Sequence, residues 1–178
     1  DKKILADNLD AMLGYIRYLD TWATDDIVEK NDPTSEWQNL GDWIPAAKEI
    51  PHNIVHTWYY WKCVEIAMRT AEIVGRDDDA KYLAMREEAI RTAFHKRFYN
   101  EELGSFGPYG ANVFALAMGV PEAWRNRVIA ALEKNIADAG GHTDADIREH
   151  ISPEQLHQRH RRVAGYERLV FVPEMGIP

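Results

Sequence analysis

The fold of this chain is decided by residues 54–74, which read IVHTWYYWKCVEIAMRTAEIV. Apolar side chains recur at helical spacing and lie on nearly every side of the helix axis. The preceding Asn53 is a favourable N-cap residue, and the following Gly75 is typical of the position after a helix C-terminus. The pattern therefore predicts a helix that is buried on more than one side.

The segment before this helix, residues 39–51, reads NLGDWIPAAKEIP and places Asp42 beside Trp43. Gly41 permits unusual backbone conformations, whereas the two prolines fix φ and interrupt a helix. A carboxylate beside an indole on a rigid loop suits a sugar site, because the carboxylate binds hydroxyl groups and the ring packs on C–H groups. A surface aspartate and a buried tryptophan in an ordinary connecting loop would give the same pattern.

Four further helices are expected at residues 4–22, 77–99, 111–118 and 122–139, with loops at 23–33 and 100–110. Asp77–Asp79 are expected to cap the second of these helices, and Glu87 and Glu88 to lie on its solvated face. No long strand pattern appears before residue 140, and no fixed repeat of about 33 to 47 residues is present. These features predict an all-α fold, either a helical hairpin array or an α/α barrel.

Composition excludes several classes of partner. The formal net charge of −8 argues against nucleic acid and against an anionic membrane surface. No segment approaches the roughly 20 apolar residues of a membrane helix. The single cysteine, Cys63, makes no internal disulfide and is expected to be a small buried hydrophobe.

Residues 140–178 differ in composition from the rest of the chain. They contain four of the seven histidines and no lysine. His157 and His160 have the spacing to share a helix face, and His142 and His150 precede them. A zinc site with this spacing needs two further defined ligands, so we expect no metal.

An ordered series of motifs runs along residues 1–147. In chain order it comprises Gly-Asp-Trp-Ile-Pro (41–45), Thr-Trp-Tyr-Tyr (57–60), Asp-Asp-Ala-Lys-Tyr (78–82), Ala-Phe (93–94), Phe-Tyr (98–99), Ala-Leu-Ala-Met-Gly-Val-Pro-Glu (115–122) and His142 after Gly-Gly (140–141). In this order and spacing the series resembles the middle of the catalytic domain of α-L-rhamnosidases, glycoside hydrolase family 78.

The resemblance implies that the chain forms part of an (α/α)6 barrel built from helical hairpins. It also implies an inverting hydrolase that acts on terminal α-L-rhamnosides, with a carbohydrate as substrate. In such enzymes one carboxylic acid protonates the leaving oxygen and a second carboxylate activates water, and the two carboxyl groups lie about 6.5–9.5 Å apart. This chemistry requires no metal and no cofactor.

The family's two catalytic carboxylates are not placed on this chain by the resemblance. The general acid lies upstream of Gly-Asp-Trp, and the general base lies well downstream. The chain also begins without Met inside a helical pattern, so we expect a fragment that is inactive alone. From about Arg148 the sequence leaves the family's register, and we hypothesise a reading-frame change or truncation. Residues 1–147 are therefore predicted to be a partial catalytic domain, followed by a tail, 148–178, of unassigned structure.

The resemblance suggests five substrate-binding residues and no catalytic residue. Asp42 is expected to bind sugar hydroxyls, and Trp43 is expected to pack on the ring or its methyl group. Tyr59, Tyr109 and His142 are candidates to line the same cleft. Core packing is an alternative explanation for Tyr59, and loop structure is an alternative for Tyr109 and His142.

Two other functions remain open at the level of sequence. A helical protein-binding scaffold would need a continuous exposed apolar groove. Another α/α-barrel glycosidase, similar to trehalases or glucosidases, would use the same residue types. The sequence separates neither rhamnose from another sugar nor one oligomeric state from another, and it fits a secreted, periplasmic or cytoplasmic parent equally.

Overall fold

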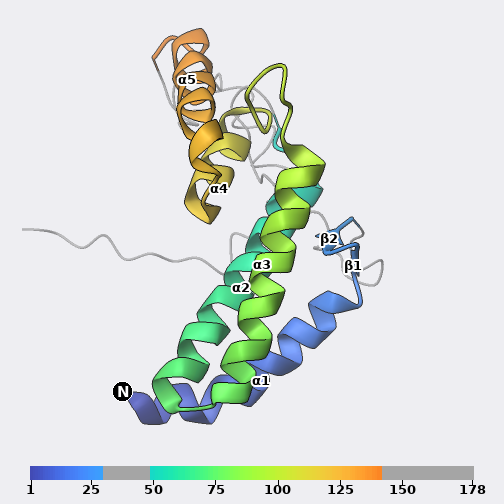
Figure 1. The fold of residues 1–178 in the computed structure, drawn as a ribbon, viewed down its shortest axis with the longest axis vertical. Coiled ribbons are helices and arrows are strands. Elements are labelled where there is room, and N and C mark those ends of the chain that lie inside the picture. The colour runs from blue at the N-terminus through green and yellow to red at the C-terminus, as the bar shows by residue number, and fades with distance from the viewer. Residues whose placement is uncertain (30–48, 142–178) are drawn as a thin grey trace, which may run out of the picture.

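The computed structural model describes residues 1–29 and 49–141, which form five helices and a short β-hairpin (Figure 1). The helices are α1 (Lys2–Asp20), α2 (His52–Val74), α3 (Asp77–Phe98), α4 (Tyr109–Met118) and α5 (Glu122–Asp138). The hairpin pairs β1 (Ala23–Thr24) with β2 (Ile27–Val28) in antiparallel fashion. The predicted all-α class, built from helical hairpins, is confirmed.

Helix α2 is the centre of the fold, because it contacts α1, α3, α4 and β2. Its fully buried residues include Tyr60, Val64, Ala67 and Ala71. The two alanines allow neighbouring helices to approach closely, and the larger side chains fill the space between them. The prediction of burial on more than one side is confirmed. One strip of α2 stays open, and its exposed large apolar side chains are Tyr59, Ile66 and Ile73.

The ends of α2 match the sequence signals only in part. Gly75 has a left-handed φ of 82° and ends the helix as predicted. The predicted N-cap role of Asn53 is wrong, because α2 already begins at His52 with Pro51 at the cap position. The Asn53 Nδ2 atom instead donates a hydrogen bond to Glu29 Oε2 at 3.0 Å. A contact distant in sequence therefore uses the amide that local capping would have used.

The other helix boundaries lie within about two residues of the prediction. Asp77–Asp79 occupy the first turn of α3, where their charges face the positive end of the helix dipole, but Arg76 holds the cap position. Helix α4 begins at Tyr109 rather than at residue 111, and α5 begins directly after Pro121. The expected helical hairpins are therefore present.

The predicted loop over residues 23–33 is wrong for its first part, which forms the β-hairpin. Asp25 and Asp26 make the two-residue turn with φ values of 50° and 64°, a conformation that aspartate tolerates better than most residues. Ile27 and Val28 are buried against the helices. Strands of two residues are too short to give a periodic signal in the sequence.

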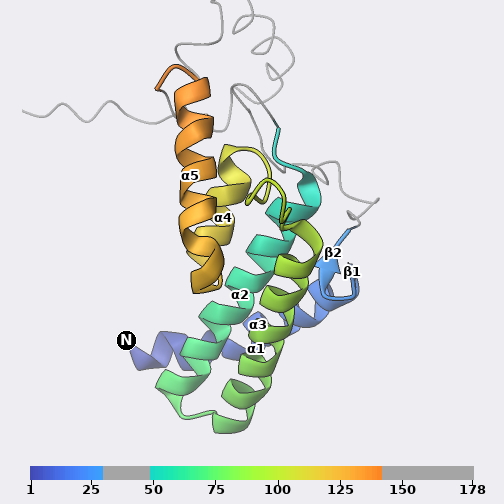
Figure 2. The same ribbon diagram turned by 45° about the horizontal axis from the view of Figure 1, so that its top comes forward.

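Helices α4 and α5 form a second hairpin beside the first half of α2 (Figure 2). The segment joining α3 to α4 and the start of α2 lie at the same end of the molecule. We call this the loop end and define it as residues 49–53, 99–110 and 138–141. It is the end at which α2 and α4 begin and α3 and α5 finish.

Candidate functional site

Two of the five predicted site residues lie in the part of the chain that the structure describes. Tyr59 is on α2, and Tyr109 is the first residue of α4. Asp42, Trp43 and His142 lie outside the described residues. Asp42 and Trp43 fall between Glu29 and Glu49, the residues that bound the first undescribed segment. His142 directly follows Gly141, the last described residue.

Tyr59 has an exposed ring that is nevertheless held in place. The residue is 57% exposed, and its ring meets Trp58 edge-on, with centroids 5.2 Å apart and planes at 88°. Phe114 of α4 stacks on Trp58 at 4.8 Å and also lies 6.4 Å from the Tyr59 ring. Such aromatic pairs restrict ring orientation. Tyr59 therefore offers a flat apolar surface whose position is set by α2 and α4 together.

Tyr109 is half-buried where the start of α4 meets the chain that enters α2. A Cβ atom added to the next residue, Gly110, would lie 2.0 Å from Ile50 Cδ1, so a larger residue does not fit there without a shift. This close approach fixes the beginnings of α2 and α4 against each other. The structure brings Tyr59 and Tyr109 onto adjoining helices, but no ring contact joins them among the described contacts.

Asn112 organises the loop that leads into α4, although no sequence pattern singled it out. Its side chain is fully buried, and all four hydrogen-bonding positions of its amide are used. Oδ1 accepts from the Phe106 N–H at 2.9 Å and the Ser105 hydroxyl at 3.1 Å, and Nδ2 donates to the Gly107 carbonyl at 3.0 Å and Asn135 Oδ1 at 3.1 Å. A lone asparagine in a helix of small residues carries no sequence signal for such contacts.

A pair of histidines precedes Tyr59 on α2, and sequence reasoning did not select either of them. His52 Nε2 lies 2.8 Å from Glu49 Oε1, and its ring meets that of His56 at 5.9 Å in a T-shaped arrangement. Burial, with a smaller contribution from His52, lowers the pKa of His56 from its ordinary value. The spacing His-x3-His-x2-Tyr was visible in the sequence and is the signal that could have found them.

Glu29, which follows the hairpin, contacts the start of α2 and the end of α3. It accepts a hydrogen bond from Asn53 of α2 at 3.0 Å and one from Arg97 Nε of α3 at 3.3 Å. Directly before it, the Val28 N–H donates to the buried Thr57 hydroxyl at 3.0 Å. Residues 28 and 29 are thus held to α2 at the point where the chain leaves toward Asp42 and Trp43.

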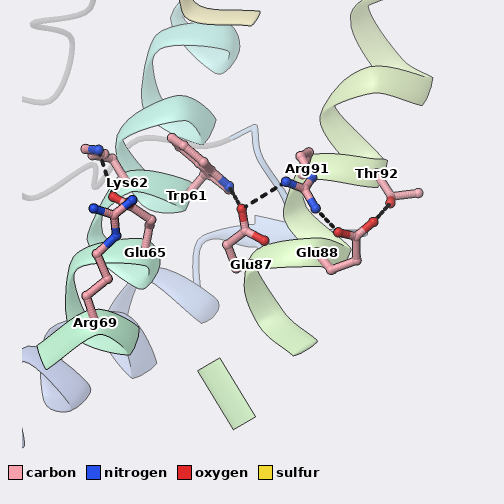
Figure 3. A network of polar contacts seen from close by, with 8 residues as sticks. All are labelled: Trp61, Lys62, Glu65, Arg69, Glu87, Glu88, Arg91 and Thr92. Carbon is pink, nitrogen blue, oxygen red and sulfur yellow. Dashed lines mark hydrogen bonds and ion pairs between the residues drawn. The ribbon is translucent and has the colours of Figure 1, made fainter. Parts of the chain in front are cut away.

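The predicted solvated face of α3 is wrong for Glu87, whose side chain is only 13% exposed. Glu87 accepts a hydrogen bond from Trp61 Nε1 of α2 at 2.6 Å and pairs with Arg91 at 3.5 Å (Figure 3). Glu88 is 61% exposed, as expected, and pairs with Arg91. Figure 3 also shows the nearly buried Glu65 between two basic side chains of its own helix. These carboxylates neutralise cations or join helices.

A second polar cluster joins four elements of the body of the fold. The Tyr60 hydroxyl donates to Asp20 at the end of α1 and accepts a hydrogen bond from Arg86 of α3. Arg86 also donates to Asp26 of the hairpin turn at 2.7 Å and to Asp20 at 3.1 Å. Burial and the hydrogen bond to Asp20 raise the pKa of Tyr60, and Arg86 opposes them only in part. These contacts tie α1, the hairpin turn, α2 and α3 together, and the buried Arg86 Nε makes no hydrogen bond within the described residues.

The described ranges, 1–29 and 49–141, lack two kinds of feature. No group of three or more His, Cys, Asp or Glu side chains is arranged there to hold a metal ion. None of the helices in these ranges combines the length and hydropathy of a membrane span. The predicted pair His157 and His160 lies outside the described residues. Cys63, expected to be buried, is half-buried, and burial raises the pKa of its thiol.

Comparison with known families and proteins gives a consistent result. The family model described as the bacterial alpha-L-rhamnosidase 6 hairpin glycosidase domain matches residues 1–147. An α-L-rhamnosidase of Alteromonas sp. (strain LOR) is 26% identical over 113 residues, which cover 58% of this chain and 12% of the relative. An α-L-rhamnosidase of Streptomyces avermitilis is 27% identical over 143 residues, which cover 75% of this chain and 13% of the relative.

Solved structures of similar proteins lead to the same family. An α-L-rhamnosidase from Dictyoglumus thermophilum superposes with a TM-score of 0.68 and 26% identity, over 81% of this chain and 17% of that chain. The Streptomyces avermitilis α-L-rhamnosidase complexed with L-rhamnose gives a TM-score of 0.66 and 25% identity, over 81% of this chain and 13% of that chain. This chain therefore spans only a small part of the length of the proteins that it resembles.

Proposed function

This chain belongs to the bacterial α-L-rhamnosidase six-hairpin glycosidase domain family, and on that premise we propose that it supplies part of the cleft of an enzyme that removes terminal α-L-rhamnose from glycans or glycosides. One observation carries the proposal for this chain itself. Within the matched region, Tyr59 presents an exposed ring that Trp58 and Phe114 hold in place. Sugar sites use rigid aromatic surfaces of this kind beside a few polar groups.

The proposed reaction is an inverting hydrolysis by two carboxyl groups. One protonates the leaving glycosidic oxygen, and the other activates a water molecule on the opposite face of the sugar, so the two carboxyl groups lie roughly 6.5–9.5 Å apart. We assign neither role to a residue of this chain, because the family positions for both fall outside its matched segment. The chain alone is accordingly proposed to bind sugar weakly and to be inactive.

The proposed roles of the site residues differ. Asp42 binds sugar hydroxyls and Trp43 packs on the ring or its methyl group, while His142 contributes from the segment that follows α5. These three assignments rest on family position. Tyr59 and Tyr109 are supported in addition by their place on α2 and α4, the helices whose starts are locked together by the contact between Ile50 and Gly110.

A binding titration of the chain with methyl α-L-rhamnoside tests the proposal. Tyr59→Ala is expected to weaken binding by about threefold or more, as the loss of one aromatic contact would. Tyr82→Ala is the matched control, since Tyr82 is a tyrosine of comparable exposure, 44%, on the separate helix α3. Equal affinities for the two variants would contradict a role for Tyr59 at the site.

The same titration with methyl α-D-glucoside addresses another sugar. Tighter binding of the glucoside would favour a trehalase- or glucosidase-like enzyme over a rhamnosidase. Inactivity of the isolated chain is tested with an aryl α-L-rhamnoside. Release of the aryl group faster than in a heat-treated sample would show that the chain carries its own catalytic carboxylates.

One observation favours the alternative of a protein-binding scaffold. An open depression of about 750 Å³ lies on α3 and is lined by Ala84, Met85, Ala89 and Ala93 among others. Met85 is 67% exposed, so this surface could receive an apolar side chain. Met85→Glu would leave sugar binding unchanged under our proposal. If the chain binds no sugar of either kind, the scaffold becomes the better explanation.

A further inference from the structure

The open strip of α2 continues from Tyr59 toward the start of the helix through His56 and His52. These three residues are at positions i, i+4 and i+7, so their side chains share one face of the helix. We propose that His56 is a further carbohydrate-contacting residue, which hydrogen-bonds a sugar hydroxyl while Tyr59 packs on the sugar ring. This inference rests on the proposed function and extends its site by one helical turn.

The geometry around His52 supports a defined orientation for this face. Glu49 holds His52 through a contact of 2.8 Å between Oε1 and Nε2. The His56 ring packs against His52 at 5.9 Å with its plane turned by 66°. The His52 ring therefore restricts the orientation of the His56 ring, as the Trp58 ring does for Tyr59. The side chain of His56 is half-buried and makes no hydrogen bond with another described residue.

The chemistry of a neutral imidazole matches that of a sugar hydroxyl. A neutral ring has one nitrogen that donates and one that accepts, and a hydroxyl group can do both. Burial favours the neutral form of His56, since its pKa lies below the ordinary value. A neutral side chain suits an uncharged ligand, because no ionic group has to be desolvated when the sugar binds.

His95 provides an internal comparison within the same chain. It also is a half-buried histidine with a pKa lowered by burial, but it lies on α3 among Phe94, Phe106 and Trp124. This aromatic surrounding belongs to the packing between α3, its following loop and α5. His95 therefore matches His56 in type and burial but lies away from the face that carries Tyr59.

Histidine-resolved NMR of the unaltered 178-residue chain tests the inference with methyl α-L-rhamnoside as the probe. We expect the ring ¹⁵N signals of His56 and the ring signals of Tyr59 to shift with the same saturation curve, while those of His95 stay in place. His56→Ala is expected to weaken binding about threefold to tenfold, the loss expected for one hydrogen bond. His56→Gln keeps a donor and an acceptor and is expected to stay within about twofold of the unaltered chain.

The outcomes separate this inference from the proposed function. If Tyr59 shifts while His56 does not, and His56→Ala binds as tightly as the unaltered chain, the inference is overturned and the proposed function stands. If the probe shifts neither residue at saturating concentration, both fail. If His56→Gln loses as much affinity as His56→Ala, a hydrogen-bonding role is wrong. The NMR shifts come from the unaltered chain, so they decide the matter even where a variant folds poorly.

Discussion

Tyr59 and Tyr60 are neighbours in the sequence and have opposite surroundings in the structure. Tyr60 is fully buried, and its hydroxyl is joined to Asp20 and Arg86. Tyr59 is 57% exposed, and its ring contacts the rings of Trp58 and Phe114. The Tyr60 hydroxyl is engaged in two contacts within the fold, whereas the Tyr59 ring presents a rigid surface to solvent.

The difference shows how one helix serves two purposes. Successive residues of a helix point about 100° apart, so one side of α2 completes the ion cluster of the body and the next side faces outward. The polar groups near Tyr60 bind chiefly one another. Near Tyr59, Glu49 holds the His52 side chain, and the His52 ring packs against the ring of the half-buried His56. We therefore interpret the Tyr60 cluster as structural and the Tyr59 face as functional.

The largest effect is expected from removing the cation at the centre of the Tyr60 cluster. Arg86→Met leaves the half-buried Asp20 and Asp26 without their cationic partner, and we expect the free energy of unfolding to fall by about 2–4 kcal/mol. Urea denaturation followed by circular dichroism measures this loss. Arg125→Met changes the same residue type at an exposed position of α5 and should stay within about 0.5 kcal/mol. Equal losses in the two variants would break the structural interpretation.

A somewhat smaller loss is expected from the buried amide of Asn112. Asn112→Ala removes four hydrogen bonds and leaves the Phe106 N–H and the Gly107 carbonyl without that partner, which should cost about 2–3 kcal/mol. Thermal unfolding gives the comparison with Asn126→Ala, an exposed asparagine of α5. If Asn112→Ala is no less stable than the control, the loop before Tyr109 is not held by this side chain.

The direct comparison of the two tyrosines is expected to give a difference of about 1 kcal/mol. Tyr60→Phe removes one hydroxyl that both donates and accepts, whereas Tyr59→Phe removes an exposed one. Urea denaturation of the pair should show a loss for Tyr60→Phe and almost none for Tyr59→Phe. The reverse order would contradict the division of α2 into a structural and a functional side.

The sequence was sufficient for those parts of the fold that depend on long periodic patterns. The apolar spacing of residues 54–74 and the stop at Gly75 gave α2, its burial and its end. The hairpin at residues 23–28 was missed because each strand has only two residues, so no period can be recognised. Asn53 was misassigned because Glu29, which it binds, lies 24 residues away.

The candidate site was predictable only where residue type alone is informative. Tyr59 could be selected as an aromatic residue in a matched motif, but its exposure depends on where α4 and Phe114 lie. Glu87 was expected in solvent because helical periodicity does not reveal that Trp61 of another helix donates to it. Asn112, His52 and His56 act through contacts that fix loop or ring orientation, and such contacts follow from packing rather than from local pattern.

The smallest effect concerns the pH dependence that His56 adds to stability. Its folded-state pKa is lowered, chiefly by burial and also by the neighbouring His52, so the unfolded chain takes up a proton at higher pH than the folded one. This contribution to stability is present above the unfolded pKa near 6.5 and is lost as the pH falls below it. His56→Gln should therefore lose less stability than the unaltered chain between neutral and mildly acidic pH in urea denaturation. All other titratable groups are common to the two proteins, so the difference between the two curves reports on His56. Parallel curves would mean that His56 is as solvated as in the unfolded chain, and the supported face proposed beside Tyr59 would lose its basis.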